Sequence, residues 1–258
     1  MISRIHKCIF IHISKCAGTT IEKAFLIPKK HIPPNYEQLY GWSEKHKLNL
    51  QHATPQQLLD TNLITKEEWS TFYKFIIVRN PWSRSYSDYM WVMQNSGVFG
   101  QFSDFIQAKG PFESLLNKKD VNYLGDHLLP QKEYFFLNGN AIKYDAVVPL
   151  ETISQGLEKV SQDLNLPHNF FKQKENVTGK KLQHYSLFYT PKRKALVAEV
   201  YKEDINFLKY TFEDQSHFSL SFMEDFRLMF SKHGKLNLRL KYPYLAYQWG
   251  IFKRRFIP

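Results

Sequence analysis

The sequence predicts an α/β protein, because three stretches of the chain each read as a strand that leads into a helix. Residues 8–25 run from an apolar, β-branched segment through a short polar loop into a helical pattern. Residues 75–89 pass from a continuous apolar run into a helix that begins at Pro81. Residues 144–164 form a short strand followed by an amphipathic helix. Continuous apolar strands of this kind are typical of a buried parallel sheet.

Composition narrows the class of protein. The 258 residues suffice for one substantial domain with a sizeable core. The formal net charge of +11 indicates an anionic partner. Two cysteines are too few for a disulfide framework and suit a reducing compartment. Neither a cleavable signal peptide nor a run long enough to span a membrane is recognisable, so we expect a cytoplasmic protein, with peripheral attachment to the membrane as a further option.

The loop at residues 14–20 has the composition of a phosphate-binding loop. A strand, a short Lys/Gly/Thr loop and a helix together direct backbone N–H groups towards an anion. The loop is not the nucleoside-triphosphate type, in which the lysine directly follows the second glycine. Here Lys15 lies three residues before Gly18, and Thr19 and Thr20 follow. The alternative is a buried strand that turns into a core helix, with Lys15 merely solvated.

A second candidate anion site follows the apolar run at residues 75–78. Arg79 stands at the carboxyl end of this strand, where ligands bind in open α/β sheets. Asn80 is the expected N-cap of the helix that Pro81 begins. Arg79 and Ser87 could hold one phosphate, the first through its charged fork and the second through its hydroxyl. A salt bridge at the end of the strand is the alternative for Arg79, and Arg84 could serve packing alone.

Two histidines are candidates for chemistry. His52 precedes a helix that Thr54 and Pro55 are expected to open, and His127 lies in a polar segment that ends at Gln131. The sequence contains no His/Cys/Asp cluster at metal-ligand spacing, so we predict no metal. Further on, residues 191–208 are periodic enough to predict one helix.

The C-terminal tail differs in composition from the rest of the chain. Residues 227–258 carry eight Lys or Arg and no Asp or Glu, with aromatic residues between them. Such a tail suits an anionic membrane surface, a sugar polymer or a nucleic acid. The alternative is that the tail packs as a helical appendage with a solvated basic face and binds no such partner.

Taken together, the motifs resemble those of the PAPS-dependent carbohydrate sulfotransferases, the chondroitin, dermatan and HNK-1 type, and more distantly heparan sulfate 2-O-sulfotransferase. PAPS is 3′-phosphoadenosine 5′-phosphosulfate. Residues 11–20 are similar to the family's 5′-phosphosulfate loop, although Cys16 stands where threonine is commoner. Residues 78–87 resemble its 3′-phosphate motif, with the spacing from Arg79 to Ser87 intact. Residues 127–131 match a later family motif except at Leu128. The similarity covers about residues 5–212.

The resemblance implies a P-loop-like three-layer fold, with a central parallel sheet flanked by helices. It implies a sulfotransferase domain at residues 1–215 and a basic, aromatic extension at residues 216–258. Arg79 and Ser87 would hold the 3′-phosphate, and Lys15 would also stabilise the leaving 3′-phosphoadenosine 5′-phosphate (PAP). No metal is required. The residues that would bind the 5′-phosphosulfate are Lys15, Cys16, Ala17, Gly18, Thr19 and Thr20.

The same resemblance implies a histidine that accepts the proton of the acceptor hydroxyl. His52 is the first choice and His127 the second; otherwise His127 would contact the acceptor together with Gln131. The acceptor would be a carbohydrate, with an acidic polysaccharide or a glycolipid favoured and nucleic acid not expected. A P-loop kinase or NTPase is the enzymatic alternative, but neither its loop nor an acidic Mg²⁺ partner is evident. A basic polymer- or membrane-binding module is the non-enzymatic one.

Overall fold

The computed structural model describes residues 1–27, 34–171 and 184–214 of the chain. The predicted extension at residues 216–258 therefore lies outside the described residues, and the proposed boundary near residue 215 stays a prediction.

The core of the fold is a four-stranded, mostly parallel sheet in the order β1-β2-β5-β8. Its strands are β1 (Ile2–Ser3), β2 (Cys8–Ile11), β5 (Tyr73–Val78) and β8 (Ala146–Pro149). β2 pairs with β5 and β5 with β8 in parallel, whereas the short β1 runs antiparallel to β2 at the edge. Every residue of β2 is buried, as are the last four residues of β5. The continuous apolar runs thus correspond to central strands, and the predicted α/β class is confirmed.

Each predicted strand leads into the predicted helix. β2 is followed by α1 (Gly18–Ala24), β5 by α4 (Pro81–Ser96) and β8 by α7 (Ile153–Asp163). The side chain of Asn80 accepts a hydrogen bond from the Trp82 N–H at 3.1 Å, which confirms it as the N-cap of α4. The loops after β2 and β5 therefore emerge at the same edge of the sheet, because the two strands are parallel.

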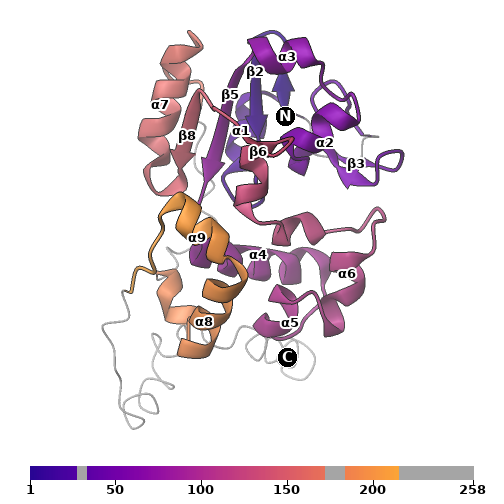
Figure 1. Cartoon of the computed structure of the whole chain (residues 1–258), viewed down its shortest axis with the longest axis vertical. Coiled ribbons are helices and arrows are strands. Elements are labelled where there is room, and N and C mark those ends of the chain that lie inside the picture. Colours follow the sequence, from indigo (N-terminus) through magenta and orange to yellow (C-terminus); the bar gives the residue numbers. More distant parts are fainter. Residues whose placement is uncertain (28–33, 172–183, 215–258) are drawn as a thin grey trace, which may run out of the picture.

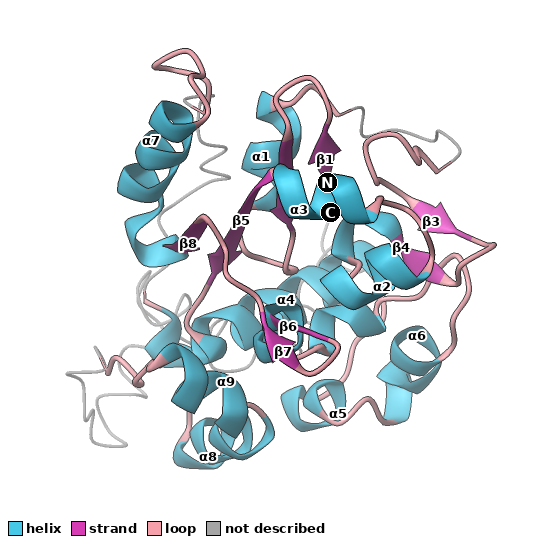
Figure 2. Cartoon of the chain, turned by 45° about the horizontal axis from the view of Figure 1, so that its top comes forward, coloured by secondary structure: helices cyan, strands magenta, loops and turns pink. Residues whose placement is uncertain are grey.

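The remaining elements are short. Figure 2 shows two hairpins apart from the central sheet, β3 (Trp42–Ser43) with β4 (Leu48–Asn49) and β6 (Phe136–Leu137) with β7 (Asn140–Ala141). The other helices are α2 (Pro55–Asp60), α3 (Lys66–Thr71), α5 (Phe102–Ile106), α6 (Glu113–Asn117), α8 (Pro191–Val200) and α9 (Lys202–Leu208).

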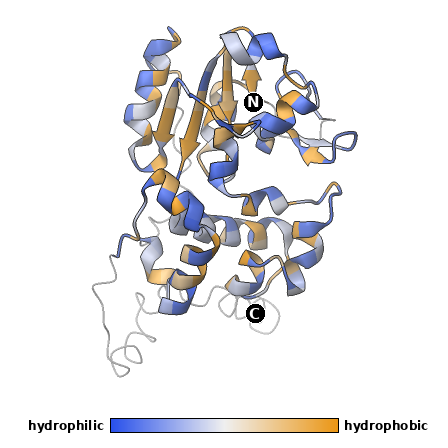
Figure 3. Ribbon diagram, viewed as in Figure 1, coloured by the Kyte–Doolittle hydropathy of each residue, from blue (hydrophilic) through white to orange (hydrophobic). Residues whose placement is uncertain are grey.

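Two apolar clusters hold these elements together. The larger surrounds the sheet, whose strands are the most hydrophobic ribbons in Figure 3. The second is rich in aromatic side chains and joins α4 to α5 and α8, in the helical half that lies below the sheet in Figure 1. α4 contributes Tyr89 and Val92 to this second cluster. Because α4 begins directly after β5, this helix connects the sheet to the helical half.

The prediction of a single helix over residues 191–208 is wrong about continuity. The structure contains two helices, α8 and α9, which meet at Tyr201. Tyr201 has φ −106° and ψ 27°, outside helical geometry, and its buried hydroxyl donates to the carbonyl of Leu128 at 3.1 Å. The apolar periodicity continues through this break, so it could not reveal the turn. Among the described residues, no helix combines the length and the apolar character needed to cross a bilayer.

Candidate functional site

The two predicted anion-binding motifs line one pocket of about 560 Å³. Its walls come from the loop after β2, the start of α1, the segment around β4, the first half of α4 and the segment before His127. The residues that line it are His12, Lys15, Ala17, Gly18, Thr19, Glu22, Tyr40, Asn49, Gln51, His52, Arg79, Ser87, Trp91, Leu124, His127 and Leu150. Lys15, His52, Arg79, Ser87 and His127, all singled out in the sequence, therefore face the same space.

The loop after β2 turns sharply to reach α1. Lys15 and Ala17 both have positive φ, 59° and 58°, a conformation that non-glycine residues adopt at a cost. Alternation of left- and right-handed residues is the backbone form that creates anion-binding concavities. Gly18 is required by space as well, because a Cβ there would lie 1.7 Å from Nε2 of His12. Thr19 is exposed and lines the pocket, whereas Thr20 is half-buried and is not among the lining residues.

Lys15 is the cation of this loop. Its Nζ lies 5.3 Å from the ring centroid of Trp91, in cation–π range. Partial burial lowers the pKa of the Lys15 ammonium, and the charge of Asp88 acts in the opposite direction. The side chain is thus held at the pocket wall by an aromatic face and by a distant carboxylate, with its positive charge available to an anion.

Cys16 has a different environment from its neighbours. Its side chain is fully buried, and Sγ lies 3.9 Å from Oε1 of Gln131. Burial raises the pKa of the Cys16 thiol to about 12, so the group is neutral and unreactive near pH 7. Its own N–H donates to the carbonyl of Ile13 at 3.2 Å. The geometry thus favours a structural role for the Cys16 side chain over the contact with the 5′-phosphosulfate that we expected from the sequence.

Arg79 connects the two motifs. Its Nη1 donates to the main-chain carbonyl of Lys15 at 3.0 Å, and its Nε donates to Oγ of Ser83 at 2.9 Å. Gln131 fixes the Arg79 backbone from both sides: Oε1 accepts from the Arg79 N–H at 3.0 Å and Nε2 donates to its carbonyl at 2.7 Å. Gln131 is fully buried and does not line the pocket. This geometry favours a positioning role for Gln131 over a contact with the acceptor.

Arg84 is buried beneath the pocket. Its guanidinium donates to the carbonyls of Ser14, Leu129 and His127 at 3.3, 2.9 and 3.1 Å, and to Oγ of Ser14 at 3.1 Å. It also lies 3.5 Å from Oδ2 of Asp88, one helical turn further along α4. Arg84 therefore ties the phosphate-type loop and the His127 segment to α4, and it is absent from the pocket lining.

His52 lies against the loop after β2. Its Nδ1 is 3.1 Å from the carbonyl oxygen of His12, which can only accept, so Nδ1 carries the proton. The His12 and His52 rings pack with their centroids 4.5 Å apart. Burial, then the neighbouring His12 and His127, holds the pKa of His52 well below its usual range. The ring is thus neutral near pH 7, with an unprotonated Nε2.

His127 is oriented by two groups of α4. Its Nδ1 is 2.6 Å from Oδ1 of Asp88, and its ring stacks on Trp91 at 4.6 Å and 9°. A carboxylate on Nδ1 is the usual device for fixing an imidazole that works through Nε2. His127 lies 5.5 Å from His52, ring centre to ring centre. Both candidate bases are therefore in the same pocket with defined tautomers.

Sequence reasoning did not single out several residues that build this site. They are His12, Glu22, Asp88, Trp91 and Asp126. Helical spacing could have indicated two of them, because Asp88 follows Arg84 by four residues and Trp91 follows Ser87 by four. The histidine–carboxylate pairs join distant parts of the chain, and no local signal reports them.

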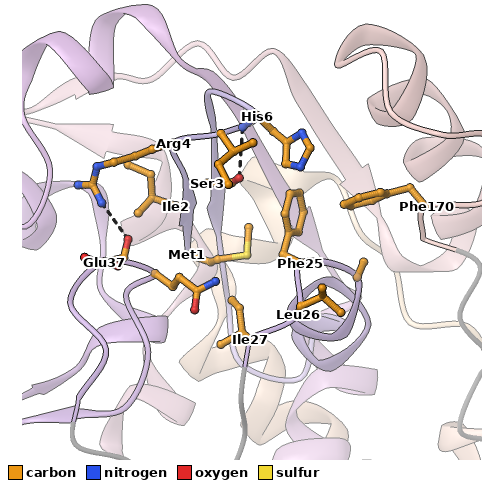
Figure 4. A pocket seen from close by; sticks show the side chains of 13 residues that line it. Met1, Ile2, Ser3, Arg4, His6, Phe25, Leu26, Ile27, Glu37 and Phe170 are labelled. Atoms are coloured by element: carbon orange, nitrogen blue, oxygen red, sulfur yellow. Dashed lines mark hydrogen bonds between the residues drawn. The ribbon is translucent and has the colours of Figure 1, made fainter.

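A second pocket, of about 760 Å³, lies beside β1 and the end of α1. Figure 4 shows its mainly apolar lining, with Phe25, Leu26 and Phe170 on one side and Arg4 reaching the carbonyl of Glu37 on the other. None of the candidate site residues borders this pocket. The candidate functional site is therefore the smaller pocket.

A mostly parallel sheet with two cation-bearing loops at the carboxyl ends of neighbouring strands defines an α/β protein with a candidate anion-binding pocket. The comparisons give the family: the Sulfotransferase family matches residues 1–211, and the chain belongs to it. Members of this family typically use PAPS as the sulfuryl donor, which agrees with two separate anion-binding motifs. No curated protein and no solved structure matched the chain significantly.

Proposed function

We propose that this sulfotransferase transfers the sulfuryl group of PAPS to a hydroxyl of a carbohydrate. The main support for this proposal is the contact between the two motifs. Arg79 donates a hydrogen bond to the carbonyl of Lys15 at 3.0 Å, and both residues line one pocket. Two such anion-binding groups suit a ligand that carries a phosphate at both the 3′ and the 5′ position of a ribose. PAPS is such a ligand, and ATP, which has no 3′-phosphate, would leave the Arg79 side unused.

The donor would lie between the loop after β2 and the start of α4. Lys15 and the backbone around Gly18 would hold the 5′-phosphosulfate, together with Thr19, which lines the pocket, and Thr20 next to it in the chain. Arg79 and Ser87, which both border the pocket, would hold the 3′-phosphate. Two of the five Arg79 N–H donors are used by Lys15 and Ser83, and the others would remain for the ligand.

The reaction would be an in-line displacement at sulfur. The acceptor oxygen forms a bond to sulfur while the bond from sulfur to the bridging oxygen of PAP breaks, and negative charge grows on that oxygen. Lys15 would stabilise this charge. The proton of the acceptor hydroxyl would pass to Nε2 of His52, which is unprotonated because Nδ1 holds the hydrogen.

The acceptor is the least constrained part of the proposal. The net charge of +11 supports an anionic acceptor such as an acidic polysaccharide or a glycolipid. The tail at residues 216–258, outside the described residues, would add a basic and aromatic surface for such an acceptor or for a membrane. A screen of acidic and neutral glycans with labelled PAPS, followed by mapping of the sulfated hydroxyl, would identify the acceptor.

Selective binding of PAP is the first expected result. Because two phosphate grips are proposed, PAP should raise the melting temperature more than ATP with Mg²⁺, AMP or an oligonucleotide at the same concentration. At a hundred times its Kd, a ligand stabilises the native state by about 2.7 kcal/mol. A larger shift with ATP and Mg²⁺, or no shift with millimolar PAP, would contradict the proposal.

The base assignment is tested by His52→Ala. We expect kcat to fall by about 10²–10⁴-fold with PAP binding retained, because general-base catalysis contributes about that factor. His168→Ala is the matched control, since His168 is an exposed histidine beside Glu158 that does not line the pocket. If His52→Ala keeps near wild-type turnover and His127→Ala does not, His127 is the base.

A further inference from the structure

A buried carboxylate oxygen beside His52 has no hydrogen-bond partner. It is Oδ2 of Asp126, the one buried side-chain nitrogen or oxygen in the described residues for which the structure shows none. The other oxygen, Oδ1, accepts from Nδ2 of Asn49 at 3.4 Å. Nε2 of His52 is 3.7 Å from Oδ2, beyond hydrogen-bond reach. A buried carboxylate without a donor or a cation is costly, so a cation or a proton at this oxygen would stabilise the structure.

Two imidazoles lie close to the Asp126 carboxylate. His52, Asp126 and His127 each offer one ligand atom, and these atoms lie within 4.8 Å of one another. No such cluster is recognisable at metal-ligand spacing in the sequence. The fold forms one because it brings His52 and His127 together from separate segments. Two histidines and one carboxylate are a common ligand set for Zn²⁺ with an open fourth position.

The surroundings of both histidines match those of metal ligands. Metal-bound histidines almost always donate their second ring N–H to a carboxylate or a backbone carbonyl, which fixes the tautomer. His127 has Asp88 on Nδ1 at 2.6 Å, and His52 has the His12 carbonyl on Nδ1 at 3.1 Å. Both rings thus keep the Nε2 lone pair for another partner. The orientation of the two histidines is an observation independent of the unpartnered Oδ2 of Asp126, and it also indicates a metal ion as the ligand.

The distances fit one ion after a small adjustment. With bonds of about 2.0–2.2 Å and tetrahedral angles, two ligand atoms on one Zn²⁺ are about 3.3–3.6 Å apart. The 3.7 Å between His52 Nε2 and Asp126 Oδ2 is close to this spacing. The widest separation in the set, at most 4.8 Å, requires side-chain movements that together amount to no more than about 1.5 Å. Imidazole nitrogen also favours Zn²⁺ over Mg²⁺ or Ca²⁺.

We propose that His52 and His127, which line the pocket, form a Zn²⁺-binding site together with the buried Asp126 beside them, and that an occupied site inhibits the enzyme. The inhibition rests on the proposed function: Zn²⁺ would take the Nε2 lone pair of His52, which then could not accept the acceptor's proton. The donor grips at Lys15 and Arg79 contribute no ligand, so PAP would still bind.

Direct metal binding tests the site without reference to activity. The full chain, freed of metal with a chelator, is titrated with Zn²⁺ by calorimetry and with Co²⁺ by visible absorption. We expect one ion per chain and Co²⁺ bands of a four- or five-coordinate site. His52→Ala, His127→Ala and Asp126→Asn should each weaken Zn²⁺ binding at least tenfold. His168→Ala should bind as the wild type does, and a cooperative thermal melt should show that each variant is folded.

The outcomes separate the two proposals. Absence of binding up to about 1 mM Zn²⁺, or equal binding by the wild type and Asp126→Asn, would overturn the metal site whatever the activity. One-to-one binding that the three variants lose would establish the site even if no sulfotransferase activity were found. With activity present, Zn²⁺ should inhibit competitively against the acceptor and not against PAPS, and a chelator should restore turnover.

Discussion

Replacing Lys15 by alanine is expected to lower kcat by about 10²–10³-fold, the effect of removing one preorganised group at a developing negative charge. The Lys15 side chain lies in the pocket wall beside Trp91, whereas its main-chain carbonyl holds Arg79. The substitution removes the ammonium and keeps the carbonyl, so the grip of Arg79 on the loop should survive. The loss in kcat should therefore exceed the loss in PAP affinity.

The measurement is steady-state kinetics with saturating PAPS, together with PAP affinity from calorimetry. Lys159→Ala is the control, because Lys159 is an exposed lysine that pairs with Asp163 on α7. Lys15→Arg tests geometry, since it keeps the charge but replaces a compact ammonium with a broad fork. A Lys15→Ala variant that retains more than a tenth of the wild-type kcat would exclude Lys15 as the group that stabilises the leaving oxygen.

Replacing Arg84 by methionine is expected to destabilise the protein by about 3–5 kcal/mol, as removal of one member of a buried ion pair does. The substitution would leave the carbonyls of Ser14, Leu129 and His127 without their donors and Asp88 without its cation. In a protein of this size the melting temperature should fall by roughly 6–20 °C, at 2–4 °C per kcal/mol.

Chemical denaturation and thermal melting of the variant measure this effect. Arg4→Met is the matched control, because Arg4 is an exposed arginine whose ion pair with Glu68 should contribute no more than about 1 kcal/mol. Arg84→Lys should fall between the two, since an ammonium cannot replace all the donors of a guanidinium fork. An Arg84→Met variant as stable as Arg4→Met would show that the buried network is not essential to the fold.

The sequence by itself determined the main architecture. The apolar runs at residues 8–11 and 75–78 predicted central strands, and the caps at Asn80 and Thr54 predicted where α4 and α2 begin. These signals are local: periodicity, capping and β-propensity act between residues that are near one another in the chain. The same locality explains the error at Tyr201, where a tertiary hydrogen bond coincides with the break between α8 and α9.

The roles of individual site residues depended on the tertiary structure. Cys16 and Gln131 belong to motifs expected to touch ligands, yet both side chains are buried and lie 3.9 Å apart. Arg84 follows Arg79 in one motif and lies beneath the pocket instead of facing it. Which face of a loop or helix meets the ligand is decided by packing against segments far away in sequence.

The carboxylates beside the histidines illustrate the physical reason. Asp88 reaches His127 from α4, and Asp126 lies 3.7 Å from His52 across a separation of 74 residues in the chain, 126 − 52. Such contacts form only when the sheet and the helical half close on each other, because no local preference relates residues so far apart. The sequence thus determined the strands, the loops and the presence of two candidate anion-binding motifs, and the tertiary structure decided which side chains share the pocket.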